Sequence, residues 1–326
     1  MATSSRSVSP TQSKANRRAP PAIALIIYPI TLIVGSIFSA ISPTARPPSR
    51  GSSDPASALA PTIAADINVP DGHSSPVNYF ARKNNIFNLY FVKIGWVWIT
   101  FAFFALLLTQ PYFTKAPSGL RGKRSAQALL RYSIVTLAWF LTTQWFFGPA
   151  VIDRAFVLTG GKCESLTPLA AAAGGGLAVD SWEEIKLIFT AAACKVAGGV
   201  WRGGHDVSGH VFMLVLGSAF LGFETLGASR SYLNVAGSEA KAKDDSDDDS
   251  TSDNEDDDDS VPIFARRFAW GVAGLSWWML FMTAIWFHTW LEKLSGLAIS
   301  LGVAYVTYLL PQSLLPWRDI TGIPGL

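Results

Sequence analysis

Long apolar runs alternate with polar segments along this 326-residue chain, and charged residues gather between the runs rather than within them. About 20 apolar residues are enough for a helix to cross the roughly 30 Å hydrocarbon layer of a bilayer. The pattern therefore predicts an all-α membrane protein. About six transmembrane helices are expected by this length rule, at residues 22–41, 87–108, 126–147, 209–226, 268–287 and 294–315.

The polar segments indicate an orientation. Residues 1–21 are rich in Ser, Pro and Arg and predict a disordered basic cytoplasmic tail, followed by a membrane domain over 22–326. The loop from Thr114 to Arg124 carries Lys and Arg without any acid, which is typical of a cytoplasmic loop. Two crossings separate the tail from this loop, so the two assignments agree. Six crossings would leave both termini in the cytoplasm.

After the third crossing the chain reaches the opposite, lumenal side. Ser181 to Glu184 has the pattern of a capping box, and apolar residues follow it at helical spacing. This predicts an interfacial helix over 180–196; a helix packed against the bundle is the alternative interpretation. Cys163 and Cys194 lie in the same lumenal segment, where an oxidising environment would permit a disulfide. A buried, inert thiol is the alternative for Cys194.

Composition and charge support this picture. The chain is 49% hydrophobic and 15% charged, with twelve tryptophans, which is typical of a membrane protein. The net charge of +2 hides an acidic run within residues 236–262, which predicts a self-repelling, disordered cytoplasmic loop. Ser246, Ser250 and Ser252 each precede an acid by three residues, so an acidophilic kinase is a possible partner; a solvated linker is the alternative. Nothing in the basic residues indicates nucleic-acid binding.

A glycine-rich stretch, K-V-A-G-G-V-W-R-G-G-H-D-V-S-G-H, leads into the fourth predicted span. Glycine pairs let a backbone approach a ligand closely, and N–H groups at the start of a helix bind anions. Lys195 and Arg202 of this stretch are candidates to neutralise a phosphate. In the alternative interpretation the stretch is a turn, and Asp206 and Ser208 cap the following helix.

Two histidines are the candidate catalytic residues. His210 begins the fourth span and His288 ends the fifth, so both belong to the same membrane face. Glu292, four residues after His288, would share its face on a continuing helix and orient the imidazole. One histidine attacking phosphorus and the other protonating the leaving oxygen would suit phosphoryl transfer without a metal or other cofactor. Lys293 is expected to anchor the interface beside Trp290.

Two alternatives to a metal-free enzyme are a transporter and a metal site. A transporter would favour broken helices in paired halves, and no inverted repeat is visible in the sequence. A bound metal is the second alternative, although no ligand-spacing signature supports it. Its candidate ligands would be His205, Asp206, His210, His288 and Glu292.

Two motifs carry a resemblance to a known family. G-G-V-W-R-G-G-H-D-V-S-G-H and the later W-F-H-T-W-L-E-K resemble the fat storage-inducing transmembrane (FIT) family, including its fungal members. That family is similar to lipid phosphate phosphatases, whose S-G-H motif matches Ser208 to His210. Their H-x-x-x-D motif matches His288 to Glu292, with Glu in place of Asp. Their K-x-x-x-x-x-x-R-P motif is only echoed by Lys195 and Arg202, so the likeness is closer at the two histidines.

The resemblance implies an enzyme of the endoplasmic reticulum membrane. It would hydrolyse fatty acyl-CoA to acyl-4′-phosphopantetheine and adenosine 3′,5′-bisphosphate, in support of lipid droplet formation, phospholipid biosynthesis and homeostasis of the organelle. By analogy with the phosphatases, His288 would be the nucleophile and His210 the general acid at a lumenal site. Fatty acyl-CoA and membrane lipids would be its partners. A non-catalytic membrane protein that binds neutral lipid and promotes droplet budding is the rival hypothesis.

Overall fold

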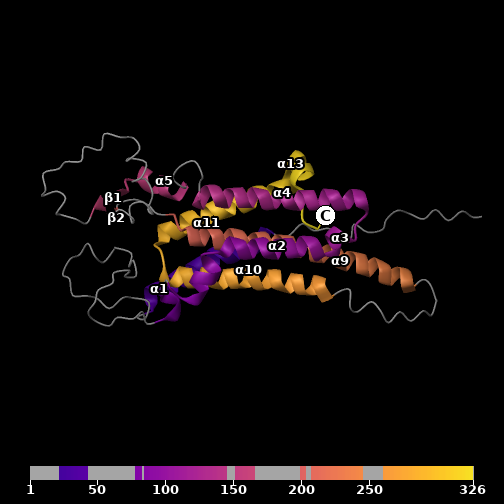
Figure 1. The fold of residues 1–326 in the computed structure, drawn as a ribbon, viewed down its shortest axis with the longest axis horizontal. Helices are drawn as coiled ribbons and strands as arrows, with labels where there is room; N and C mark the ends of the chain where they lie inside the picture. Colours follow the sequence, from indigo (N-terminus) through magenta and orange to yellow (C-terminus); the bar gives the residue numbers. More distant parts are fainter. Residues whose placement is uncertain are drawn as a thin grey trace, which may run out of the picture.

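The computed structural model describes residues 22–42, 78–82, 84–144, 151–165, 199–202, 207–244 and 260–325 (Figure 1). Its first half comprises η1 (Ala22–Ile26), α1 (Ile27–Ile41), η4 (Tyr79–Ala81), η5 (Asn88–Val92), α2 (Gly95–Thr109), α3 (Pro111–Thr114), α4 (Ser118–Thr143) and α5 (Val151–Leu158). The second half comprises β1 (Lys162–Ser165), β2 (Gly199–Arg202), α9 (Gly209–Asp244), α10 (Ser260–Trp286), α11 (Trp290–Ala304), η6 (Tyr305–Leu309), α12 (Leu310–Ser313) and α13 (Leu315–Thr321).

Helix α9 is the centre of the bundle. It packs against α10, α11 and α2, and also contacts α3 and α4. Every residue from Val211 to Leu221 is buried, and Phe212, Leu216 and Phe220 are among the largest side chains of the core. A helix that is apolar around its whole circumference must be covered on all sides, by other helices or by lipid, and here neighbouring helices bury it. The hydrophobic run after the glycine-rich stretch is therefore the core of the fold.

Among the described residues, four helical segments are long and apolar enough to cross a membrane. They are Ala22–Ile41, Gly209–Ser229, Ser260–Trp286 and Trp290–Ser313; Gly95–Thr109 is apolar but shorter. Helix α1 is the least buried of the four, and only one stripe containing Tyr28, Leu32 and Gly35 faces the bundle. Its exposed Ile, Val and Phe side chains suit a hydrocarbon environment. Helices occur at all six predicted positions, and the number of actual crossings stays a prediction.

Several helix boundaries differ from the predicted ones. Helix α4 begins at Ser118, inside the predicted basic loop, and α9 continues to Asp244. Together with the start of α10 at Ser260, this makes both edges of the predicted acidic loop at 236–262 helical. Hydropathy marks where a helix leaves the apolar layer, whereas the backbone hydrogen bonds continue through good helix formers such as Ala, Lys and Glu.

The second predicted span, 87–108, is also interrupted. The π-helical η5 ends at Val92, and α2 begins only at Gly95, so the predicted continuous helix is broken at Lys93 and Ile94. A side chain at Gly95 would clash with Met213 of α9, because a Cβ built there lies 2.7 Å from the Met213 methyl carbon. The interruption thus lies beside a close contact between α2 and α9. Lys93 is exposed at this bend, which agrees with a lysine near a helix end.

Where the structure describes the chain, it is helical apart from one short antiparallel sheet, which the hydropathy pattern did not predict. Strand β1 pairs with β2 so that Lys162 lies opposite Arg202 and Ser165 opposite Gly199. Figure 1 places the sheet and α5 at the end of the bundle where α9 begins. The predicted tail at 1–21, the interfacial helix at 180–196, Cys194 and the kinase-site serines lie outside the described residues. The side chain of Cys163 does too.

A buried ion pair joins α4 to α9. Arg131 donates from Nε and one terminal nitrogen to the two carboxylate oxygens of Glu224, at 2.6 and 2.8 Å. Tyr308 donates to the same carboxylate at 2.9 Å, and Arg131 also donates to the carbonyl of Thr321 at 2.7 Å. The bidentate geometry satisfies both charges, which is what burial of an ion pair requires. The network ties α4, α9, η6 and the C-terminal α13 together.

Removing one partner of this pair should destabilise the fold strongly. Glu224→Leu leaves the Arg131 guanidinium buried without its carboxylate, and we expect the free energy of unfolding to fall by about 3–5 kcal/mol. The double variant Arg131→Met/Glu224→Leu removes both charges and should recover most of that loss. Thermal unfolding in detergent measures both, and a double variant as unstable as the single one would contradict this account.

Candidate functional site

The connection between α10 and α11 presents His288. Helix α10 ends at Trp286 and α11 begins at Trp290. The sequence allows a helix that continues through His288, and the structure instead places His288 in the connection between the two helices. Its φ of 62° is the one positive value among the non-glycine residues of the described chain. Such a conformation costs about 1–3 kcal/mol, persists only where neighbouring contacts enforce it, and is concentrated at functional sites. The turn therefore marks His288 as a candidate independently of its chemistry.

A capping box begins α11 and brings Glu292 to the histidine. The Thr289 hydroxyl accepts from the Glu292 N–H at 3.4 Å, and the Glu292 carboxylate accepts from the Thr289 N–H at 2.9 Å. The sequence T-W-L-E carries this S/T-x-x-E signal, which the sequence analysis missed because it assumed an unbroken helix. The expected contact between Glu292 and His288 thus exists, but the capping box creates it rather than helical periodicity.

The imidazole of His288 is oriented by that carboxylate. Its Nδ1 lies 3.1 Å from Oε2 of Glu292, and the two side chains are 22% and 18% exposed. A carboxylate only accepts hydrogen bonds, so the contact places a proton on Nδ1. In the neutral ring Nε2 then keeps its lone pair and faces away from Glu292. This is the tautomer that a nucleophilic or basic histidine needs.

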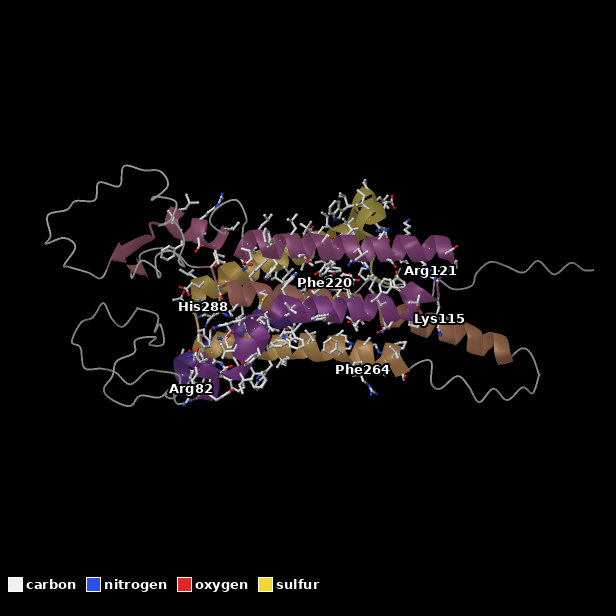
Figure 2. All side chains as sticks on the ribbon, viewed as in Figure 1. Arg82, Lys115, Arg121, Phe220, Phe264 and His288 are labelled. Atoms are coloured by element: carbon white, nitrogen blue, oxygen red, sulfur yellow. The ribbon has the colours of Figure 1, made fainter. Side chains whose placement is uncertain are left out.

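His210 lies beside His288 although 78 positions separate them in the sequence. The two ring centroids are 6.1 Å apart, and the rings are inclined by 43°. His210 is in the first turn of α9, and its side chain is exposed. Figure 2 places His288 at one end of the bundle and Lys115 and Arg121 of the predicted cytoplasmic segment at the opposite end. The site is therefore a pair of accessible rings at one end of the helices.

Close backbone packing between α11 and α9 brings the two histidines together. The Ser208 N–H donates to the Glu292 carbonyl at 3.1 Å, and a Cβ built on Gly296 would lie 2.6 Å from the Ser208 carbonyl oxygen. Only glycine allows α11 to approach the start of α9 this closely. The Ser208 hydroxyl accepts from the Val211 N–H at 3.3 Å, so this buried serine caps the start of α9.

The remaining sequence candidates are less fully placed. The backbone of Arg202 lies in β2, at the same end of the bundle as the histidines (Figure 1), and its side chain lies outside the description. Lys195, His205 and Asp206 lie outside the described residues. The phosphate-binding role of Lys195 and Arg202 and the metal alternative, which needs His205 and Asp206, therefore stay predictions.

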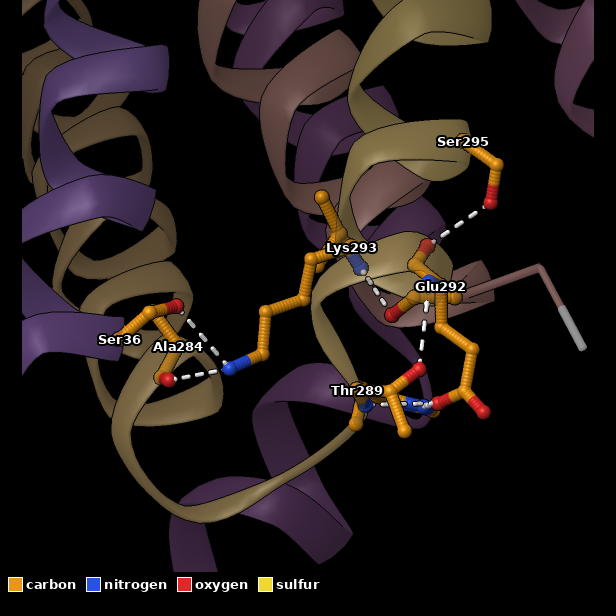
Figure 3. Close-up of polar contacts among 9 residues, drawn as sticks. Ser36, Ala284, Thr289, Glu292, Lys293 and Ser295 are labelled. Carbon is orange, nitrogen blue, oxygen red and sulfur yellow. Dashed lines mark hydrogen bonds and ion pairs between the residues drawn. The ribbon is translucent and has the colours of Figure 1, made fainter. Parts of the chain in front are cut away.

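Lys293 differs from its expected placement at the membrane interface. Its side chain is 4% exposed and lies inside the bundle, whereas its neighbour Trp290 is 52% exposed. The ammonium donates to the carbonyl of Ala284 at 2.6 Å and to the hydroxyl of Ser36 at 3.2 Å (Figure 3). Sequence reasoning missed this role because helical position in α11 alone does not show that α1 and α10 enclose this side of the helix.

The fold and the site thus define a helical membrane protein of several spans with a carboxylate-oriented histidine pair at one end of the bundle. The sequence profile of the fat storage-inducing transmembrane protein family matches residues 76–308. The chain belongs to this family, as its two motifs indicated. Helix α1 precedes the matched region. No solved structure matches the chain.

Several relatives are similar to the chain over most of its length. The chain is 31% identical to acyl-coenzyme A diphosphatase fit1 of Schizosaccharomyces pombe over 248 residues, which cover 76% of this chain and 80% of the relative. It is 27% identical to acyl-coenzyme A diphosphatase FITM2 of Danio rerio over 238 residues, 72% of this chain and 74% of the relative. Acyl-coenzyme A diphosphatase SCS3 of Saccharomyces cerevisiae is 21% identical, over 61% of this chain and 63% of the relative.

The approach of α11 to α9 gives a direct test of the site's construction. In Gly296→Ala the new methyl group would overlap the Ser208 carbonyl, and we expect a loss of about 1–3 kcal/mol in the free energy of unfolding. Gly302→Ala on the same helix is the matched control, because no atom lies within 4 Å of a Cβ built there. Thermal unfolding in detergent compares them; equal stability of the two variants would show that the close contact is unimportant.

Proposed function

We propose that the protein is a fatty acyl-CoA diphosphatase of the endoplasmic reticulum membrane, with its histidine pair on the lumenal side. It would hydrolyse fatty acyl-CoA to acyl-4′-phosphopantetheine and adenosine 3′,5′-bisphosphate. The observation that carries the proposal is the pairing of His210 with His288, whose Nδ1 is held by Glu292. The relatives are named acyl-coenzyme A diphosphatases, which supports this substrate. Its cellular role would be in lipid droplet formation, phospholipid biosynthesis and homeostasis of the organelle.

The geometry suits a two-step displacement. Nε2 of His288 attacks one phosphorus of the diphosphate, and the bond to the bridging oxygen breaks. That oxygen leaves with the second phosphate and takes a proton from His210 acting as general acid. Water then attacks the phosphohistidine and passes a proton to His210, the bond between phosphorus and Nε2 breaks to release His288, and the water oxygen stays on the attacked phosphate. Glu292 keeps the proton on Nδ1 and stabilises the positive charge that develops on the His288 ring.

The position of the site agrees with the predicted topology. The histidines lie at the end of the bundle opposite Lys115 and Arg121, which belong to the segment that the positive-inside rule assigns to the cytoplasm. This relation supports a lumenal site and cytoplasmic termini. Glycosylation sites engineered into the segment 166–198 and protease protection in sealed microsomes would test that orientation.

Hydrolysis of oleoyl-CoA by purified protein in detergent tests the mechanism. We expect chelator-resistant release of adenosine 3′,5′-bisphosphate by the wild type, and a loss of at least about 10³-fold in kcat in His210→Ala and in His288→Ala. His73→Ala, between the first and second predicted spans, is the matched control and should retain full activity. Activity that a chelator removes and zinc restores would contradict the metal-free mechanism, and undiminished activity in either site variant would remove that histidine from the chemistry.

Glu292→Gln separates orientation of the imidazole from capping of the helix. Glutamine can also complete a capping box, so the free energy of unfolding should change little. The neutral amide no longer stabilises a positively charged His288 ring, and we expect kcat to fall about 10²–10⁴-fold. Wild-type kcat in this variant would show that the carboxylate only caps α11.

A cavity within the helices favours a second function, lipid binding. It has a volume of about 290 Å³ and lies between α1, α9 and α10. Its lining includes Tyr28, Gly222, Gly274 and Trp277, and the Tyr28 hydroxyl accepts from Ser218 at 3.0 Å. All three helices are candidate membrane spans, so the cavity opens within the apolar layer and suits a hydrocarbon chain. This is the observation that supports neutral-lipid binding and a role in droplet budding.

Filling the cavity should reduce lipid binding without disturbing the fold. Gly222 and Gly274 line it, and no atom lies within 4 Å of a Cβ built on either, so leucine there would occupy the cavity. Gly271→Leu on α10 is the matched control, because Gly271 has the same free space but does not line the cavity. We expect binding of radiolabelled triacylglycerol in detergent to fall in Gly222→Leu and Gly274→Leu and to remain in Gly271→Leu. Equal binding in all three would place any lipid site elsewhere.

A further inference from the structure

The buried Lys293 completes the end of α10. Its ammonium donates to the carbonyl of Ala284, in the last turn of a helix that ends at Trp286. The last carbonyls of a helix have no partner within the helix and attract positive charge. Lys293 belongs to the first turn of α11, so it reaches back across the connection to satisfy the helix that precedes it (Figure 3).

Both partners of Lys293 are neutral oxygens. A buried ammonium is unfavourable unless its N–H groups are hydrogen-bonded. An apolar side chain would fill the space between these helices at a lower free-energy cost. Figure 3 shows its side chain extending toward Ser36 and Ala284, whereas the Glu292 side chain extends to the other side of α11. The ammonium is therefore directed away from the His288–Glu292 pair, and it is not placed to bind a phosphate there.

The connection that carries His288 is thus held at both ends. The capping box of Thr289 and Glu292 secures it to α11, and the bond from Lys293 to Ala284 secures it to α10. His288, between these two attachments, has the positive φ that neighbouring contacts must enforce. Loss of the Lys293 bond would let the end of α10 unwind and relax that conformation.

Helix α1 contributes to this arrangement although it precedes the region that the family profile matches. Ser36 accepts the second hydrogen bond of Lys293. Gly35 packs directly on the same turn of α10, because a Cβ built there would lie 2.5 Å from the Ala284 Cβ. Helix α1 therefore closes the pocket that holds the ammonium against the Ala284 carbonyl.

We propose that Lys293 is a positioning residue for His288, and that α1 supports the site because its Gly35 and Ser36 enclose the Lys293 ammonium. The lysine acts through the backbone of the α10–α11 connection and does not touch the substrate. This inference rests on the proposed function insofar as His288 is the catalytic group. It adds that the first membrane helix is part of the catalytic apparatus.

Steady-state kinetics on acyl-CoA distinguish positioning from substrate binding. In Lys293→Met we expect kcat to fall about 10- to 100-fold, because displacement of a reacting group by about 1 Å has effects of this size. KM should stay within about threefold of the wild type, since no substrate contact is lost. A lysine that binds phosphate would instead show a large rise in KM, and that result would overturn the proposal.

Gly35→Ala tests the role of α1 while leaving Lys293 in place. The added methyl group must push α1 away from Ala284, so we expect the same selective loss of kcat as in Lys293→Met. Gly271→Ala is the matched control on α10, with no atom within 4 Å of the new Cβ, and should behave as the wild type. Ser36→Ala removes only one acceptor and should lower kcat about two- to fivefold, with no additional effect in the Lys293→Met background.

Amide hydrogen exchange provides a readout that does not depend on activity. Exchange over residues 284–290 should accelerate in Lys293→Met and Gly35→Ala, while exchange over α9 near His210 stays at the wild-type rate. If the wild type does not hydrolyse acyl-CoA, the proposed function fails, and this exchange still decides whether Lys293 holds the turn. Unchanged exchange in both variants would overturn the proposal.

If Lys293→Met does not accumulate in membranes, Gly35→Ala and Ser36→Ala test the proposal instead. Wild-type kcat in both of these variants would refute the proposal.

Discussion

The contact between the first turns of α9 and α11 is the constraint on which the site depends. Backbone meets backbone there, with the Ser208 N–H bonded to the Glu292 carbonyl and Gly296 against the Ser208 carbonyl. Because no side chain intervenes, small errors in this packing cannot be absorbed by a change of rotamer. This contact brings the start of α9, and with it His210, beside the turn that carries His288 and Glu292.

Polar groups inside the bundle follow one rule at both ends of the molecule. Within the described chain, buried charged side chains join separate helices. Arg131 and Glu224 connect α4 to α9, and Lys293 connects α11 to α10 and α1. In an apolar layer these groups have no water to exchange with, so their partners must come from neighbouring helices. Ionic and hydrogen-bonded contacts thereby define a register that apolar packing alone would leave adjustable.

The histidine site combines a strained turn with accessible rings. His288 has a backbone conformation that its neighbours must maintain, while its ring remains partly exposed beside the exposed His210. Rigid support beneath an open surface is what a hydrolytic site requires, because the reacting groups must be oriented while a large substrate enters.

The sequence by itself predicted helices at six stretches and two histidines on one membrane face. The structure has helices at all six positions and places the two histidine rings 6.1 Å apart, whereas the number of membrane crossings stays a prediction. Hydrophobic length and charge position decide the first, and chain topology decides the second, because the end of one span and the start of the preceding one must lie on the same side. These features depend on local composition and connectivity. They were predictable without knowledge of any contact.

Only the tertiary structure decided how the residues of the site are held. The S/T-x-x-E signal at Thr289 was present in the sequence, but it acts as a capping box only because a new helix, α11, begins after the break at the end of α10. Lys293 looked like an interfacial anchor because its burial depends on α1, a helix more than 250 positions away in the chain. The hydropathy pattern also did not predict helix ends such as Asp244, because a helix ends where its backbone hydrogen bonds end and not where its apolar residues end. Long-range packing selects among conformations that local sequence leaves equally acceptable, and that is why it was decisive at this site.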